Sequence, residues 1–364
     1  MTQAFWVIVV AGLLALAQIW YYRRVAFKKL SYSRTISRSR VYEGEHIQLV
    51  EVISNNKLTP LPWLRVESRL SPYLQFRSHD DLSIKDERFH RSVFFVRPFS
   101  RITRRYDILC AHRGYFDLSN TTLTVGDLFG MTAFPKQLMQ PTRLYVYPNA
   151  LSDDELPQEA LRWQGDISVR RWIFPDPILI NGIREYRSGD SRKDIHWKAS
   201  ARTGQLQVKT HDYTVQPKMV LLLNIDPKEN FWGELTEEQQ EQVEHGIRVV
   251  ATLARWGYDN DMEVGFYSNG CLQDVPQRTR IGQLPAHSNQ QQEQLLSMLA
   301  AFNPKQIESI YHTLERMVVD QLDDADILVV SSWWSDGLNQ RCDELRRRGN
   351  NVTHIPFGKG GEDA

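Results

Sequence analysis

The residues best suited to chemistry are gathered between positions 182 and 204, a segment that mixes Arg, Asp, His and Trp between turn glycines. Asp194 and His196 stand two positions apart, so in an extended strand both side chains would point to the same side. Together with Asp190 they could bind a divalent metal ion, or act as a general acid and base. This pattern supports one hypothesis for function, a metal-dependent hydrolase.

The same segment can also be interpreted as a structural clasp, because its basic and acidic residues lie close enough to pair. In this interpretation Trp197 packs beneath the ion pairs, and His196→Ala destabilises the fold instead of abolishing a reaction. The arginines and their expected acidic partners are Arg184, Arg192 and Arg202, with Glu185, Asp190 and Asp194.

Several strong catalytic motifs are absent from the sequence. It contains no glycine-rich phosphate loop followed by Lys-Ser/Thr, so the chain is not itself a P-loop ATPase. A Gly-x-Ser-x-Gly elbow, a His-Glu-x-x-His helix and a Cys-x-x-Cys pair are missing as well. The sequence therefore favours an interaction protein over an enzyme.

The charge of the chain is balanced overall but unevenly distributed. Lys+Arg and Asp+Glu each number 44 among the 364 residues. Residues 1–150 contain 21 basic and 11 acidic residues, whereas residues 151–364 contain 23 and 33. We therefore do not expect a nucleic-acid-binding protein. The few, widely spaced cysteines exclude a disulfide scaffold and are typical of a reducing compartment.

Residues 4–22 form an apolar run in which Gln18 is the one strongly polar residue. At about 1.5 Å per residue, a helix of this length crosses most of the hydrocarbon layer of a bilayer. A cleaved signal peptide would need a Lys or Arg before the run, and none is present. A basic cluster follows the run instead, from Arg23 to Arg40. We therefore expect a single-pass anchor in the cell membrane, with the N-terminus outside and the bulk of the chain in the cytoplasm.

Residues 41–150 contain short β-prone runs separated by Asn- and Pro-rich turns, which predicts an all-β sandwich domain. The anchor and its basic extension occupy 1–40, the charged segment lies within 151–217, and an α/β domain is expected over 218–364. The expected strands of the sandwich are at 45–53, 92–96, 103–110, 119–125 and 143–147.

The α/β domain is predicted to contain a parallel, Rossmann-like sheet. Continuous apolar runs of strand length are typical of strands buried on both faces, and helical periods alternate with them. The expected strands are at 218–225, 263–267, 326–331 and 352–357, and the expected helices are at 236–257, 291–302, 306–322 and 339–348.

Two local signals add detail to this domain. Thr236 and Gln239 have the spacing of a capping box at the start of a helix. Ligands of such sheets bind beyond the carboxyl ends of the strands, which directs attention to loops at 224–234, 268–285 and 331–337.

The charged segment carries a longer pattern, Arg-Glu-Tyr-x-x-Gly-Asp-x-x-Lys-x-Ile-x-Trp-Lys-x-Ser-Ala-Arg-Thr-Gly, which resembles the signature of the domain-of-unknown-function 58 family. Upstream stretches at 113–116, 127–130 and 146–148 agree with the same family, so the resemblance covers nearly the whole chain. The residues that carry the central signature are Arg184, Glu185, Tyr186, Gly189, Asp190, Asp194, His196, Trp197 and Arg202.

The resemblance implies a von Willebrand factor type A-like domain at the C-terminus. It also implies association with AAA+ ATPases of the MoxR type, and with a transglutaminase-like membrane protein whose gene is often a neighbour. No enzymatic activity is established for the family.

Type A domains often bind Mg²⁺ through Asp-x-Ser-x-Ser after the first strand, and hard oxygen ligands suit that ion. Here Asn224 replaces the first Asp, and Lys228, at the place of the second Ser, would repel a cation. Asp226 and Asp336 are the remaining candidate carboxylates, unless both are solvated loop residues. We therefore expect a degenerate site and no bound cofactor, with Mg²⁺ as the ion to test.

Trp333 and Trp334 follow an expected strand and are candidate interface residues, since large aromatic side chains anchor many protein interfaces. The alternative is that both pack against the β-domain or residues 151–217. The leading hypothesis is a membrane-anchored scaffold that docks a partner through the carboxyl edge of the sheet. The alternatives are the hydrolase that would use Asp190, Asp194 and His196, and a purely structural envelope protein.

Overall fold

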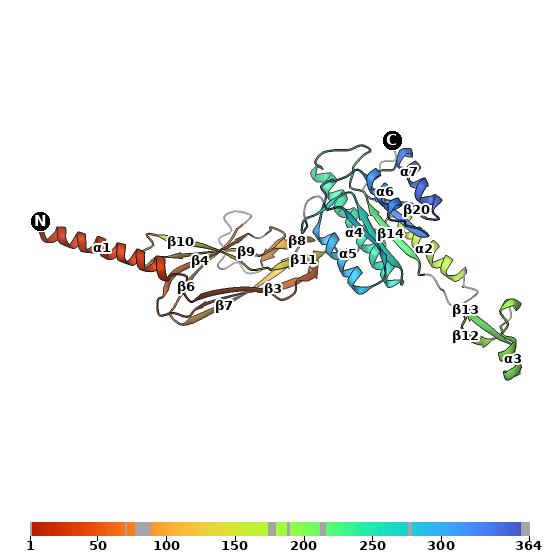
Figure 1. The fold of residues 1–364 in the computed structure, drawn as a ribbon, viewed down its shortest axis with the longest axis horizontal. Helices are drawn as coiled ribbons and strands as arrows, with labels where there is room; N and C mark the ends of the chain where they lie inside the picture. The colour runs from red at the N-terminus through yellow and green to blue at the C-terminus, as the bar shows by residue number, and fades with distance from the viewer. Residues whose placement is uncertain are drawn as a thin grey trace. The chain divides into compact units, whose positions relative to one another are not determined.

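The computed structural model describes residues 2–69, 71–76, 89–173, 180–187, 190–211, 216–275 and 279–357. The chain divides into two compact units (Figure 1). The first unit consists of residues 1–149 and 297–302, and the second consists of residues 150–296 and 303–364.

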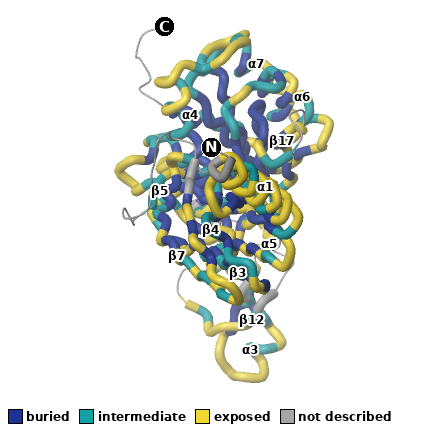
Figure 2. The backbone as a smooth tube through the Cα atoms, turned by 90° about the vertical axis from the view of Figure 1, so that its left-hand side faces the viewer, coloured by how far each residue is buried: buried dark blue, intermediate teal, exposed yellow. Residues whose placement is uncertain are grey.

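The first unit begins with the helix α1 (Thr2–Val25), whose segment Phe5–Val25 is long and apolar enough to cross a membrane. Most of its apolar residues are exposed, and the helix is drawn mainly in yellow in Figure 2. An apolar N-terminal helix was predicted and is confirmed, while its insertion in a membrane and its orientation stay predictions.

The end of α1 is fastened to the rest of the first unit by a buried lysine. The Lys57 ammonium donates hydrogen bonds to the carbonyl of Val25 at 2.6 Å and to the carbonyl of Ala26. The Tyr21 and Thr59 hydroxyls lie 2.6 Å apart and add a third hydrogen bond. Burial lowers the pKa of Lys57 to about 8, so the side chain is still mainly the charged donor at neutral pH. A cation at this position also suits the negative end of the helix dipole.

The N-terminal β-rich region is confirmed and consists of three sheets. Pairing is antiparallel except between β2 and β11. The first sheet has the order β1 (Leu30–Ile36), β3 (His46–Asn55), β7 (Ser100–Cys110), β5 (Leu74–Phe76). The second sheet has the order β10 (Ala133–Met139), β9 (Asn120–Gly126), β4 (Leu61–Arg69), β6 (Phe89–Val96). The third sheet has the order β2 (Arg40–Tyr42), β11 (Arg143–Tyr147), β8 (Gly114–Asp117).

The two four-stranded sheets share an apolar core. Buried and more accessible residues alternate along β3, as expected for a strand with one face in the core. One cluster of buried side chains takes Ile53 from β3, Val66 from β4, Phe94 from β6 and Leu123 from β9. The cluster therefore draws on both sheets.

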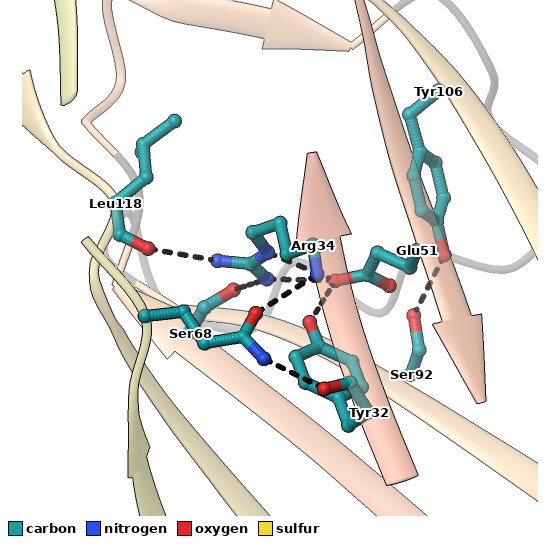
Figure 3. A network of polar contacts seen from close by, with 8 residues as sticks. Tyr32, Arg34, Glu51, Ser68, Ser92, Tyr106 and Leu118 are labelled. Carbon is teal, nitrogen blue, oxygen red and sulfur yellow. Dashed lines mark hydrogen bonds and ion pairs between the residues drawn. The ribbon is translucent and has the colours of Figure 1, made fainter. Parts of the chain in front are cut away.

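A buried ion pair lies within this core (Figure 3). The guanidinium of Arg34 on β1 donates to Glu51 Oε1 on β3 at 2.7 Å, and each side chain is 1% exposed. The hydroxyl of Tyr32 donates to the same oxygen at 2.7 Å, and Arg34 also donates to Ser68 Oγ on β4 at 2.8 Å. Because Ser68 belongs to the second sheet, the network links the two sheets.

The second unit contains a five-stranded mixed sheet in the order β17-β15-β14-β19-β20. Four strands are parallel and coincide with the predicted ones: β14 (Lys218–Leu223), β15 (Glu263–Ser268), β19 (Ala325–Ser331) and β20 (Asn351–Pro356).

The fifth strand corrects the prediction of a purely parallel sheet. β17 (Ile281–Ala286) runs antiparallel to β15, at an edge that we had expected to be a loop. Its Gly282 and Pro285 are typical of turns, and an edge strand tolerates proline because one side of it has no strand to pair with.

The helices of the second unit follow the expected alternation. The capping box of Thr236 and Gln239 is present at the start of α4. α2 and the short helix at Trp197–Thr203 were not predicted, and the four predicted helices differ from their predicted bounds by a few residues. The remaining elements are α2 (Gln158–Ile173), α4 (Glu237–Asp259), α5 (Asn289–Ala301), α6 (Ile310–Val319), α7 (Asp336–Arg347) and the short strands β16 (Cys271–Leu272) and β18 (Phe302–Asn303).

The buried ion pair leads to a stability prediction. Glu51→Ala leaves the Arg34 guanidinium uncompensated in the core, so we expect the first unit of the full-length protein to lose about 3–5 kcal/mol of unfolding free energy. The measurement is urea denaturation in detergent micelles. The control is Arg38→Ala, which breaks an ion pair with Glu45 whose side chains are 53% and 38% exposed, and which should cost at most about 1 kcal/mol. Equal losses in the two variants would contradict the prediction.

Candidate functional site

The signature segment folds as a hairpin with a short helix between its strands. β12 (Ile180–Glu185) pairs with β13 (Gln207–His211), and the connection holds the 3-10 turn η1 (Arg192–Asp194) and the helix α3 (Trp197–Thr203). Ile195 bridges to Val208, and both side chains are buried. This contact gives the segment a small core of its own.

Asp190 is held by Arg184 in a two-pronged ion pair. Arg184 donates to both carboxylate oxygens at 2.7 Å, and the amide of Arg187 donates to Oδ2 at 2.7 Å. The hydrogen bonds from Arg184 lower the pKa of Asp190 to about 2. This is one of the pairs that the clasp interpretation predicted.

His196 performs a local structural task as the N-cap of α3. The amide of Ala199 donates to His196 Nδ1 at 3.1 Å, and the Ser200 hydroxyl donates to the His196 carbonyl. Asp194 lies in η1. No group of three or more His, Cys, Asp or Glu side chains in the described ranges is arranged to hold a metal ion. The structure thus brings Asp190 to Arg184 and His196 to the start of a helix.

Trp197 does not pack beneath the clasp, and our expectation was wrong. Trp197 is 68% exposed, whereas the bridged residues Ile195 and Val208 are the buried apolar residues of the hairpin. Ile183 and Leu206, on the same hairpin, are also about half exposed.

The other described signature residues lie on the strands of this hairpin or in the connection between them. Tyr186 donates its amide to the Leu206 carbonyl at 2.9 Å, and Glu185 is in register with Gln207. Arg192 begins η1, and Arg202 lies in the last turn of α3. Gly189 lies outside the described residues.

The second cluster of candidate residues lies where the strand order of the five-stranded sheet reverses. β14 leads along the chain to β15 on one side, while β19 lies on its other side. Ligands of open α/β sheets bind beyond the carboxyl ends of the strands at this switch point. Asn224 and Asp226 follow β14, and Trp333 follows β19.

Polar side chains bind the ends of these strands to one another. Asn224 Nδ2 donates to Ser331 Oγ at 3.0 Å, and Asn269 Oδ1 accepts from the amide of Ile225 at 3.0 Å. The indole of Trp333 donates to the Asp226 carbonyl at 2.7 Å. Asn269 was not singled out from the sequence, although an Asn directly after a buried strand is a usable signal.

Asp226 is buried, so it is not the solvated loop residue that one interpretation expected. Its residue is 3% exposed, and no hydrogen-bond partner for Oδ1 is found in the part of the chain that the structure describes. Burial raises the pKa of Asp226 to about 7, although hydrogen bonds from Asn269 and from the amide of Ile310 lower it. A carboxyl group of this kind exchanges its proton near neutral pH.

The donors around Asp226 do not fit Mg²⁺, which takes several hard oxygen ligands. The Asn224 carboxamide oxygen already accepts from the amide of Asp226 at 3.1 Å and from Asn269 at 3.2 Å. Asp336 is exposed at the start of α7, and Lys228 is exposed as well. We therefore assign no metal chemistry to this cluster.

Trp333 and Trp334 are partly buried and pack against the apolar core of the second unit. Trp334 stacks on His354, with ring centroids 4.7 Å apart and an angle of 22°. The indole of Trp333 is engaged with the Asp226 carbonyl, as described above. Less of their surface is accessible to a partner than that of Trp197.

Comparisons with known proteins agree with the signature. The model of the family described as "Protein of unknown function DUF58" matches residues 182–355, which include both the hairpin and the five-stranded sheet. The chain is 22% identical over 216 residues to the uncharacterized protein YeaD of Bacillus subtilis. This match covers 59% of the present chain and 50% of YeaD, so the chain spans about half the length of the curated relative.

Similarity to solved structures is weak. A cohesin module of a family 33 glycoside hydrolase from Clostridium perfringens has a TM-score of 0.23 at 8% identity, covering 33% of this chain and 98% of the module. The sporulation control protein Spo0M of Bacillus subtilis has a TM-score of 0.19 at 11% identity, covering 44% of this chain and 59% of Spo0M. Scores of this size establish neither fold nor function.

The raised pKa of Asp226 predicts a pH dependence of stability. Between about pH 4 and pH 7 the folded protein retains a proton that the unfolded chain has released, so stability falls as the pH rises and levels off above pH 7. Asp226→Asn removes this slope and should raise the unfolding free energy at pH 8 by about 4 kcal/mol. The measurement is urea denaturation at a series of pH values. Asp336→Asn, at an exposed position, is the control. A slope unchanged in Asp226→Asn would contradict the assignment.

Proposed function

We propose that this protein is a membrane-anchored scaffold that binds a partner protein through its signature hairpin. The observation that carries the proposal is the exposure of Trp197 on a locally rigid support. Truncation of a tryptophan at the centre of an interface often removes much of the binding energy. α1 would hold this scaffold in the membrane, with the N-terminus outside and both the β-rich region and the second unit in the cytoplasm.

The hairpin has the properties of a docking element. His196 caps the helix that begins with Trp197, and the Arg184–Asp190 pair joins the end of β12 to the segment just before η1. Little conformational entropy would therefore be lost when a partner binds. Exposed Ile183 and Leu206 extend the apolar surface.

The fold of the second unit supports the type A-like domain that the family resemblance implies. β14, the first strand of the sheet along the chain, is central, and later strands are added on both sides of it. Doubly wound, Rossmann-like sheets have this order. It is compatible with a von Willebrand factor type A-like domain. The resemblance suggests a MoxR-type AAA+ ATPase as the partner, with a transglutaminase-like membrane protein as a further component, in the assembly or remodelling of envelope proteins.

The proposal predicts that Trp197→Ala weakens binding of a MoxR-type ATPase by about 30-fold, as expected for loss of an interface hot spot worth about 2 kcal/mol. Binding is measured by pull-down and titration of the full-length protein in micelles, with and without ATP. Trp232→Ala is a matched control, because Trp232 is also 68% exposed but lies in the loop after β14.

The control also distinguishes docking through the signature hairpin from docking through the carboxyl edge of the five-stranded sheet. Loss of binding in Trp232→Ala alone would place the partner at the carboxyl edge of the sheet. If the unmodified protein does not bind the ATPase in either nucleotide state, the proposed partner is wrong.

A further inference from the structure

Three loops of the first unit lie at the end where α1 joins it. The strand register sets this arrangement, because Asn55 pairs with both Leu30 and Ser100, at the start of β1 and of β7. Leu61, at the start of β4, pairs with Val96 at the end of β6. The loops at 56–60, 97–99 and 127–132 therefore surround the exit of α1, beside the ends of β6 and β10 in Figure 1.

These loops expose large apolar side chains to an unusual degree. In a soluble domain such side chains are normally scattered singly, whereas here five of them lie in three neighbouring loops. They are Leu58 (76% exposed), Phe99 (70%), Leu128 (56%), Phe129 (69%) and Met131 (65%).

The longest of the three loops is internally fixed in this exposed form. Asp127 is fully buried and accepts hydrogen bonds from the amide of Met131 at 2.8 Å and from the Thr132 hydroxyl at 3.0 Å. These bonds hold the apolar tip, Leu128 and Phe129, out from the sheet. Phe99 also has a positive φ of 49°, a conformation that costs a bulky residue energy.

The exposed charges at this end are all basic. Asp127 is the one acidic residue in the three loops and in the connection from α1 to β1, and it is buried in its own loop. The exposed basic residues there are Arg23, Arg24, Lys28, Lys29 and Arg97.

We propose that this end of the first unit docks onto the lipid interface of the membrane that α1 enters. The apolar loop tips would lie at the boundary between headgroups and acyl chains, and the basic residues would contact anionic headgroups. The apolar span ends at Val25, and Lys57 binds the Val25 carbonyl directly, so the loops are held at the depth where the helix leaves the bilayer. The inference rests on the membrane anchoring in the proposed function.

The test places a fluorescent probe at the loop tip. The three native cysteines, Cys110, Cys271 and Cys342, are buried, so an NBD label reacts selectively with a cysteine introduced at an exposed position. Met131→Cys, in the loop just before β10, is compared with Met139→Cys, a 79% exposed site at the far end of β10. Both full-length variants are reconstituted in vesicles of phosphatidylcholine and phosphatidylglycerol containing spin-labelled lipid.

We expect blue-shifted emission at position 131 and quenching about threefold stronger than at position 139, as for a side chain at the headgroup boundary. Leu128→Cys should give the same result and guards against a local fault in one variant. In vesicles of phosphatidylcholine alone, quenching at position 131 should weaken. Equal quenching in the two lipid mixtures would overturn the role of the basic residues.

A third label distinguishes failure of this inference from failure of the anchor. Leu13→Cys reports on the middle of α1. Strong quenching at position 13 with weak, equal quenching at 131 and 139 would overturn the docking surface and leave the anchor intact. Absence of quenching at position 13 would overturn both.

Discussion

The bond between the Lys57 ammonium and the last carbonyls of α1 is the interaction on which the organisation of the first unit depends. The end of any helix leaves carbonyl groups without intrahelical partners. Here Val25 and Ala26 receive theirs from a buried side chain of the β-rich region. A helix that ended in water would be joined to that region by a free linker. Lys57 binds α1, and the Tyr21 and Tyr22 hydroxyls contact Thr59 and the Pro60 carbonyl. The helix and the loops around its exit therefore keep one arrangement, on which the lipid-docking surface depends.

The two units treat a buried carboxyl group in opposite ways. In the first unit, Glu51 faces the guanidinium of Arg34 and the hydroxyl of Tyr32, so its charge is compensated and its role is structural. In the second unit, the donors that Asp226 finds among the described residues are the neutral amides of Asn269 and Ile310, and burial raises its pKa to about 7. Burying a carboxyl group without a charged partner destabilises the fold, so such a residue is a candidate functional residue. Asp226 lies at the switch point of the sheet, where such a position is expected.

The sequence predicted the elements whose patterns are local and strong. The apolar runs at β14 and β19, the capping box at Thr236 and the N-terminal helix were all found. What it did not predict depends on contacts between distant residues. β17 has the composition of a loop and becomes a strand only because β15 offers it an edge. In the hairpin, Ile195 bridges to Val208 and is buried while Trp197 is exposed, and the buried Asp226 accepts hydrogen bonds from Asn269 and from the amide of Ile310. These partners are remote in sequence or carry no pattern of their own.

The central claim, that α1 and the β-rich region form one body, can be tested by a distance measurement. Spin labels are introduced at Leu14→Cys on α1 and at Gln137→Cys on β10, two exposed positions of the full-length protein. Pulsed electron–electron double resonance spectroscopy in nanodiscs then gives the distribution of distances between the labels. If the helix and the β-rich region form one body, we expect one narrow distribution that broadens when Lys57→Met removes the cation. A broad distribution in the presence of Lys57, unchanged by its substitution, would contradict it.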